Sequence, residues 1–333
     1  MKKFLLCTGL LFFAATIFAQ KTSTVHLLKT FHIASGGGWD YIEADFGNKI
    51  YVTHGSQVNI LNKSNGDSSD FIANTNGVHG VAFDAAQEKG FTSNGRSNNV
   101  SVFNTKTNKV ITQIATGLNP DAIMYDPFSK KIITCNGRSK TLSFIDPIKN
   151  ILLDSVSVGG VPETAVSDEE GKVYVNIEDK NEIAVIDAKS FKVISKWSLV
   201  PGEGPTGLAI DKKTKRLFVG CEKLLIVMDA NTGKIIDKIA IGDGCDGVVF
   251  DAETKNIFTA NGEGTISVIH EDNKNKFNLT ETIITKKGAR TISLDTRTHL
   301  LYLPTADFAN ADPKVKGRPK MIQGSFQVLV YGK

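Results

Sequence analysis

An aspartate recurs seven times along the chain at nearly constant spacing, each time at the end of a short apolar segment. The seven residues are Asp45, Asp84, Asp126, Asp168, Asp211, Asp251 and Asp295. Successive members lie 39, 42, 42, 43, 40 and 44 residues apart. Each of the first six units consists of four short segments rich in β-branched and aromatic residues, separated by turns, which is typical of strands. A strand-only repeat with a period of about 40 residues predicts an all-β fold, a seven-bladed β-propeller with four-stranded antiparallel blades.

The two ends of the chain predict how this ring closes. The seventh unit contains three strands, TISLD, LLYLPTA and FQVLVYGK, whereas the other units contain four. The segment TVHLLKTFHI, residues 24–33, is a spare strand ahead of the first unit. We expect this N-terminal strand to pair with FQVLVYGK and complete the last blade, because closure leaves only short, protected strand edges.

Two glycine-rich stretches, GEGPTG at Gly202–Gly207 and GDGCDG at Gly242–Gly247, match the G-x-G-x-x-G pattern of a dinucleotide-binding turn. That turn requires a preceding strand and a helix that begins within it, so that the helix N-terminus meets the pyrophosphate. Both stretches are followed instead by strand, turn and strand. The sequence therefore predicts that these glycines are joints between blades, where a positive φ is often needed.

The first 19 residues have the layout of a secretory signal peptide. Two lysines follow Met1, an apolar run extends from Phe4 to Ala19, and a polar segment begins at Gln20. The run is short for a spanning helix, with an uncleaved anchor as the alternative. We therefore expect a periplasmic or secreted protein, with a signal peptide over residues 1–19 and one propeller domain over residues 20–333. No membrane span is expected after cleavage.

The net charge of the chain argues against two classes of main partner. The formal net charge is +4, and removal of Lys2 and Lys3 lowers it to +2. This value gives no electrostatic reason to expect nucleic acid or an anionic membrane as the main partner.

Three cysteines follow the signal peptide, Cys135, Cys221 and Cys245. Cys221 ends the second strand of the fifth unit, and Cys245 starts the first strand of the sixth. The sequence leaves open whether they form a disulfide or remain two free thiols.

The repeats resemble the YVTN family of propeller repeats. The similarity lies in IYVTHG (Ile50–Gly55), in KVYVN (Lys172–Asn176) and in the junction DANTGKIIDKIAIGDG, and it covers essentially all of residues 20–333. The chain looks like a YncE-like seven-bladed propeller, in the wider group that includes the quinoprotein amine dehydrogenase heavy chain. The resemblance implies the fold and carries over no catalytic residue. The quinone cofactor of the amine dehydrogenases belongs to a different chain.

In a four-stranded blade, the start of the first strand and the end of the second lie at one end of the propeller, around the mouth of the central channel. We call this end the rim. The candidate ligand-binding residues there are Trp39, Asp40, His54, His79, Asn94, Arg96, Asp121, Asn136, Arg138, Glu163, Asp246, Asn261 and Arg290. Thr206, Glu178 and Glu222 complete the ring. Such a polar opening predicts a ligand site.

Several features also have a purely structural interpretation. The seven recurring aspartates lie at the opposite end, where they are expected to cap turns. The Asn-Gly pairs that follow the second strands are expected turn residues, whereas the matching Arg96 and Arg138 are candidates for binding an anion. His54 and His79 come from adjacent units, and no H-x-H or H-x-x-E-H pattern supports a metal. The long segment at 304–325 is expected to form a partial lid or a docking loop at the rim.

Three functions remain open. The preferred one is a monomeric, non-catalytic binding propeller without a cofactor, which captures a small polar or anionic ligand or a periplasmic protein at the rim. The alternative is a metal-dependent, lactonase-like hydrolase or lyase, with calcium held in the channel by Glu163, Asn136, Asp246 and Asn261. The third is an accessory subunit of a periplasmic redox system. It rests on analogy of fold alone, since the chain has no C-x-x-C-H haem motif.

Overall fold

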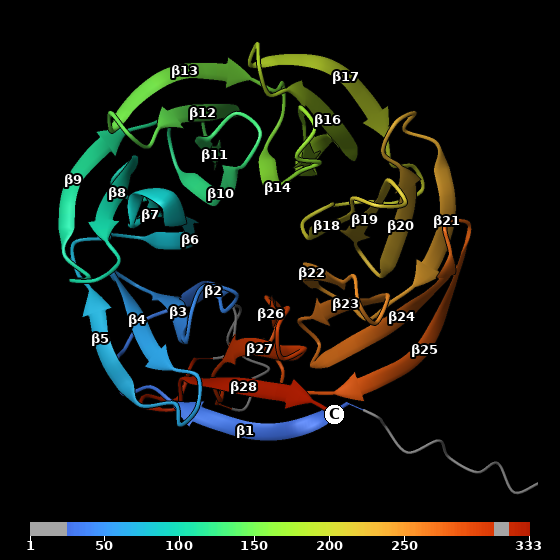
Figure 1. The fold of residues 1–333 in the computed structure, drawn as a ribbon. Helices are drawn as coiled ribbons and strands as arrows, with labels where there is room; N and C mark the ends of the chain where they lie inside the picture. The colour runs from blue at the N-terminus through green and yellow to red at the C-terminus, as the bar shows by residue number, and fades with distance from the viewer. Residues whose placement is uncertain (1–24, 310–319) are drawn as a thin grey trace, which may run out of the picture.

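The computed structural model describes residues 25–309 and 320–333. Twenty-eight strands form seven four-stranded antiparallel sheets around a central channel (Figure 1). This arrangement confirms the predicted seven-bladed propeller. Within the described ranges, two single 3-10 turns, η1 (Ala85–Gln87) and η2 (Glu178–Lys180), are the helical elements, and no helix is long and apolar enough to cross a membrane.

The blades are numbered in chain order, and their strands run from the channel outward. Blade 1 contains β2 (Trp39–Glu43), β3 (Lys49–His54), β4 (Gln57–Asn62) and β5 (Ser68–Ile72). Blade 2 contains β6 (Val78–Asp84), β7 (Lys89–Asn94), β8 (Asn99–Asn104) and β9 (Val110–Ala115). Blade 3 contains β10 (Pro120–Asp126), β11 (Lys131–Asn136), β12 (Thr141–Asp146) and β13 (Ile151–Ser157). Blade 4 contains β14 (Pro162–Ser167), β15 (Lys172–Ile177), β16 (Glu182–Asp187) and β17 (Lys192–Ser198).

The remaining blades follow the same order until the last. Blade 5 contains β18 (Leu208–Asp211), β19 (Arg216–Cys221), β20 (Leu224–Asp229) and β21 (Ile235–Ala240). Blade 6 contains β22 (Cys245–Asp251), β23 (Asn256–Asn261), β24 (Thr265–Asn273) and β25 (Lys276–Ile284). Blade 7 contains β26 (Ser293–Asp295), β27 (Leu300–Thr305), β28 (Gln327–Gly332) and, outermost, β1 (His26–His32).

The hydrophobic core is divided into seven clusters of described residues, one at each interface between adjacent blades. Phe144 and Val175, for example, belong to the cluster between blades 3 and 4. The middle strands of a blade, such as β11, are buried on both faces, whereas the outer strand β13 is exposed along most of its length. Each blade therefore depends on both neighbours to cover its apolar faces, as in other repeat proteins.

The N-terminal strand closes the ring as predicted. β1 pairs antiparallel with β28 along its whole length, and the two strands lie together at the outer side of blade 7 (Figure 1). Phe31 and Ile33 are buried in the cluster between blades 7 and 1, and the Ile33 N–H donates to the Phe326 carbonyl at 2.9 Å. The predicted signal peptide, and residues 310–319 of the long segment, lie outside the described residues.

The recurring aspartates cap turns, in agreement with their structural interpretation. Six of them accept hydrogen bonds from backbone N–H groups of the turn that follows, as Asp126 does from Ser129 at 2.9 Å and Asp211 from Lys213 at 2.8 Å. Asp45 differs, because it accepts from the Thr296 N–H of blade 7 at 3.0 Å. Gly242 and Gly244 of GDGCDG join β21 to β22, with Gly244 at φ +68°, whereas Gly247 lies within β22, and no helix begins there.

Candidate functional site

One residue of each blade lies at the mouth of the channel, five positions before the recurring aspartate. This set, which we call the hub, consists of Asp40, His79, Asp121, Glu163, Thr206, Asp246 and Arg290. In five blades the pairing of the first two strands shifts register across the hub position. Such bulges commonly redirect a side chain near a functional site. In blades 5 and 7 the hub residue precedes the first strand.

Three hub residues from consecutive blades form a compact group. His79 Nδ1 lies 2.6 Å from Asp40 Oδ2 and 3.7 Å from Asp121 Oδ2. Burial lowers the pKa of His79, but the hydrogen bond to Asp40 and the charge of Asp121 outweigh it and raise this pKa above its ordinary value. One imidazole nitrogen and two carboxylate oxygens lie within 4.8 Å of one another. These are ligand types that a divalent cation accepts.

Arg290 extends this group around the mouth. Its Nε donates to Asp246 Oδ2 at 2.5 Å, and its Nη2 lies 3.4 Å from Asp40 Oδ1. Asp40 therefore contacts both the guanidinium and the imidazole. The result is a continuous chain of charged groups, from Asp246 through Arg290, Asp40 and His79 to Asp121, that spans five blades. Sequence reasoning placed all of these residues at the rim, and the structure brings them together.

The hub contains more carboxyl side chains than positively charged ones. Glu163 has no hydrogen bond or ion pair with another described residue. Burial raises its pKa to about 9, and the charges of Asp121 and Glu178 add to this effect. Burial also raises the pKa of Asp121 to about 7, with the positive charge of His79 acting against it and the charge of Asp40 adding to it. At neutral pH the hub therefore keeps Glu163 protonated.

Replacing Glu163 by Gln is expected to change the pH dependence of stability. Between its ordinary pKa and about 9 the folded state binds a proton that the unfolded state has lost. The free energy of unfolding therefore falls as pH rises through this window. Glu163→Gln cannot ionise, so we expect its melting temperature to exceed that of the wild type by about 2–4 °C at pH 8, and by less at pH 5. Scanning calorimetry at both pH values measures this difference.

The exposed Glu203 supplies a matched control, because Glu203→Gln should leave the melting temperature unchanged at both pH values. A difference between Glu163→Gln and the wild type that stays constant from pH 5 to pH 8 would contradict this assignment of the hub charges.

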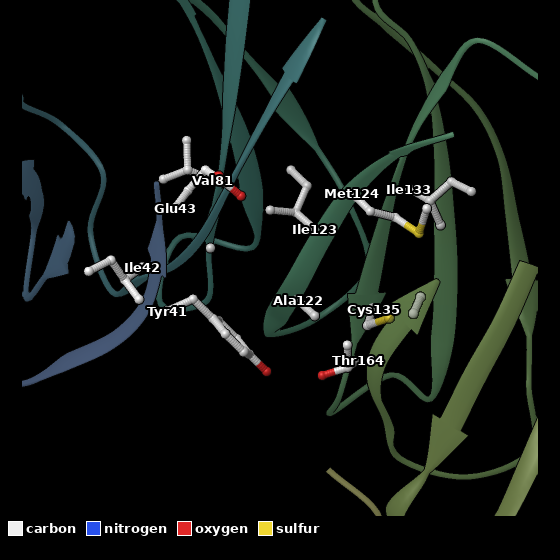
Figure 2. Close-up of a pocket in the computed structure, with 12 residues that line it drawn as sticks. Tyr41, Ile42, Glu43, Val81, Ala122, Ile123, Met124, Ile133, Cys135 and Thr164 are labelled. Carbon is white, nitrogen blue, oxygen red and sulfur yellow. The ribbon is translucent and has the colours of Figure 1, made fainter. Parts of the chain in front are cut away.

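A cavity of about 130 Å³ lies beside the hub and is lined by blades 1 to 4. Figure 2 shows Tyr41 extending toward Cys135 and Thr164 across this cavity. Burial, and then the charges of Asp121 and other hub carboxylates, raise the pKa of Tyr41 well above its ordinary value, so its hydroxyl stays protonated. Burial also raises the pKa of Glu43, on the cavity wall, to about 7. The cavity is thus walled by neutral groups at low pH and gains charge above pH 7.

A larger cleft of about 740 Å³ lies between blades 1, 6 and 7 on the rim. Its side chains are Trp39, Lys287, Arg290, Phe308 and Met321, and the rest of its lining is Gly37, Gly38, Gly244, Gly262 and Gly288. We call it the rim cleft. The ring centroid of Trp39 lies 6.0 Å from that of Phe308 and 5.4 Å from that of Phe326. Arg290 belongs to both the rim cleft and the hub, so the two are adjacent.

Three predicted ligand residues lie inside the blades and not in the channel. Asn94, Asn136 and Asn261 are fully buried. Each accepts from a threonine two residues before it, and its Nδ2 donates to two oxygens of the third strand. Their polar atoms are thus already used to tie the second strand to the third. This removes Asn136 and Asn261 from the calcium site considered for a lactonase.

The remaining predicted rim residues also fall outside the hub. His54 is 1% exposed. Its Nε2 donates to the Gly37 carbonyl at 2.7 Å, its Nδ1 accepts from Ser35 Oγ at 2.6 Å, and burial lowers its pKa. Arg96 and Arg138 are exposed and form no ion pair within the described part of the chain. They do not line the rim cleft, so its cations are Lys287 and Arg290 instead.

Cys221 and Cys245 are buried free thiols in this structure, so the disulfide expected as one alternative is not formed. The physical reason is the alternation of side chains along β19. Cys221 faces the cluster between blades 4 and 5, whereas Cys245 belongs to the cluster between blades 5 and 6. It is Gly220 that faces Cys245, since a Cβ on Gly220 would lie 2.7 Å from the Cys245 sulfur.

Several residues of the site were missed by sequence reasoning. Tyr41 directly follows the hub residue Asp40, four positions before Asp45, so the repeat pattern could have identified it. Lys287 lies in a joint between blades, and Phe308 and Met321 lie in the long segment of blade 7, where they form an isolated β-bridge. Lys287, Phe308 and Met321 do not follow the repeat of about 40 residues, because their positions depend on how the ring closes.

Comparison with known proteins shows the fold and no more. No protein-family model matches the chain, and no curated protein matches it. Among solved structures 1671 chains match, one of them a chain of "Kuenenia stuttgartiensis Hydrazine Synthase". That chain aligns with a TM-score of 0.71 and 12% identity, over 86% of this chain and 95% of the other. At this identity the likeness shows that the protein has the propeller fold.

Proposed function

We propose that this protein is a non-catalytic binding propeller that captures a small molecule in the rim cleft. The observation that carries the proposal is the cleft itself. Its volume of about 740 Å³ lies within the range of about 300–1,000 Å³ usual for small-molecule sites. Trp39, Phe308 and Met321 supply an apolar wall, and Arg290 and Lys287 supply a few polar groups, a composition typical of such sites.

We infer further that the chain is an exported, monomeric member of the YVTN-like propellers. The layout of residues 1–19 supports export, and the repeat motifs IYVTHG and KVYVN support the family. The rigid ring suits a binding role, because seven packed interfaces hold side chains from distant parts of the chain in place.

Filling the rim cleft at Gly38 is expected to weaken binding strongly. No heavy atom lies within 4 Å of a Cβ added to Gly38, and its φ is outside the left-handed region. A leucine there can therefore occupy the cleft without displacing the fold. For the uncharged probe N-phenyl-1-naphthylamine, whose fluorescence increases in an apolar site, we expect Gly38→Leu to raise the dissociation constant about tenfold or more.

Gly36 provides the matched control, because it has the same open surroundings but does not line the cleft. Gly36→Leu should bind the probe as the wild type does. A Trp197→Phe background leaves Trp39 as the single tryptophan, and its emission should change when the probe binds. Equal affinity in Gly38→Leu and Gly36→Leu would refute the proposal.

A metal-dependent hydrolase is a second candidate, favoured by the Asp40–His79–Asp121 group. These residues would hold the ion, and it would activate a water molecule or polarise a substrate oxygen. Arg290 weighs against this role, because its positive charge lies 3.4 Å from an oxygen of Asp40 and disfavours a cation beside it. Stoichiometric zinc, manganese or calcium in the purified full-length protein, lost in Asp121→Asn, would favour the enzyme over the binding propeller.

A further inference from the structure

Apart from the methionine sulfur, the polar side-chain atoms of the described residues that line the rim cleft are all hydrogen-bond donors. Among the described lining residues, tryptophan, lysine and arginine side chains donate and cannot accept, phenylalanine does neither, and the methionine sulfur is a weak acceptor. These described residues therefore offer no strong side-chain acceptor. A ligand that uses polar contacts in this cleft must bring its own acceptors.

The backbone of the cleft also offers unpaired hydrogen-bond donors. The carbonyls of all five lining glycines already accept a hydrogen bond, from His54 Nε2 and from the N–H groups of Gly55, Gly262, Gly288 and Arg290. By contrast, the N–H groups of Gly37 and Gly38 have no acceptor among the described residues. The Trp39 Nε1 is likewise buried without a hydrogen-bond partner in the described part of the chain. Among these groups, the described donors are thus unpaired, whereas each glycine carbonyl already has one donor.

The charged side chains of the lining also favour a ligand that carries acceptors. Lys287 is exposed and forms no ion pair with a described residue, and Arg290 lies at the boundary with the hub. Asp40 and Asp246 lie behind Arg290 and bind its guanidinium, which weakens its pull on a ligand but fixes its orientation. Neither carboxylate belongs to the lining of the cleft. A cationic ligand would therefore be repelled by Lys287, whereas an anion would be attracted to it, with a smaller contribution from the paired Arg290.

From these observations we infer that the ligand of the rim cleft is a small organic anion, a carboxylate or sulfonate carried on an apolar body. The apolar body packs against Trp39, Phe308 and Met321, and the anionic group faces Lys287 and the unused N–H donors. The inference rests on the proposed function, since it names the chemical class that the same cleft binds.

Two probes that share one apolar body test the class. The anionic 8-anilinonaphthalene-1-sulfonate and the uncharged N-phenyl-1-naphthylamine are titrated into the full-length protein at low ionic strength. We expect the sulfonate to bind at least about threefold more tightly, and Lys287→Met to weaken it by about three- to tenfold while leaving the uncharged probe unchanged. Lys192→Met, a substitution of an exposed lysine on the outer strand β17, is the control and should alter neither affinity.

The outcomes separate this inference from the proposed function. If both probes lose binding in Gly38→Leu but the uncharged one binds as tightly as the sulfonate, or tighter, the anion class is wrong and the cleft remains a binding site. The same conclusion follows if Lys287→Met and Lys192→Met weaken the sulfonate equally. If neither probe depends on Gly38, the proposed function fails as well.

Discussion

Without its N-terminal strand, the protein is expected to unfold about 10 °C or more below a chain that starts at Val25. The shorter chain starts after Ile33 and loses three buried side chains, Val25, Phe31 and Ile33, which are 6%, 5% and 3% exposed. Burial of each such side chain contributes about 1.5–3 kcal/mol, and the net stability of a domain is only about 5–15 kcal/mol. Loss of β1 also exposes the edge of β28. Scanning calorimetry of the two chains measures the difference.

A single substitution separates loss of the strand from loss of its packing. In the full chain, Phe31→Ala should lower the free energy of unfolding by about 3–5 kcal/mol. Leu27→Ala, on the same strand but 48% exposed, should have little effect. Equal melting temperatures for the shortened chain and for the chain that starts at Val25 would show that β1 does not hold the ring closed.

Asn136→Ala is expected to lower the melting temperature by about 5 °C or more without changing the affinity of a ligand in the rim cleft. The buried amide accepts from Thr134 and donates to Thr141 and Ser143, at 2.9, 3.1 and 2.9 Å. Its loss leaves three hydroxyl groups without this partner, and each such hydrogen bond contributes about 1 kcal/mol.

Asn231, an exposed residue in the turn after β20, provides the comparison for this experiment. Asn231→Ala should leave both the melting temperature and the affinity unchanged. If Asn136→Ala instead kept its melting temperature and lost affinity for the anilinonaphthalene probes, Asn136 would have the ligand-binding role that the sequence suggested.

The repeat period predicted the fold and the hub but not the cleft. The offset between the recurring aspartates and the start of each first strand placed Asp40, His79, Asp121 and Arg290 at one end, and strand geometry alone brings such positions together. The roles of Asn94, Asn136 and Asn261 could not be predicted, because they depend on which face of the second strand an end residue occupies. A shift of one residue also separates Cys221 from Cys245.

The rim cleft arises from tertiary closure. Lys287, Phe308 and Met321 come from irregular segments of blades 6 and 7, and Trp39 comes from the first strand of blade 1. These segments meet only because β1 completes blade 7 and brings blade 1 beside it. The hydrogen bonds that occupy the glycine carbonyls are likewise invisible in the sequence. The rim positions predicted a polar or anionic ligand with Arg96 and Arg138 as its partners, whereas the cations that line the rim cleft are Lys287 and Arg290.

The central claim, that a small ligand occupies the rim cleft, is tested most directly by locating a bound probe. A crystal of the full-length protein with 4-bromonaphthalene-1-sulfonate would show the bromine by its anomalous signal. We expect the bromine beside Trp39 and Phe308, with the sulfonate facing Lys287. A bromine bound elsewhere, for example on the exposed apolar residues of β13, with the rim cleft free of probe, would contradict the account.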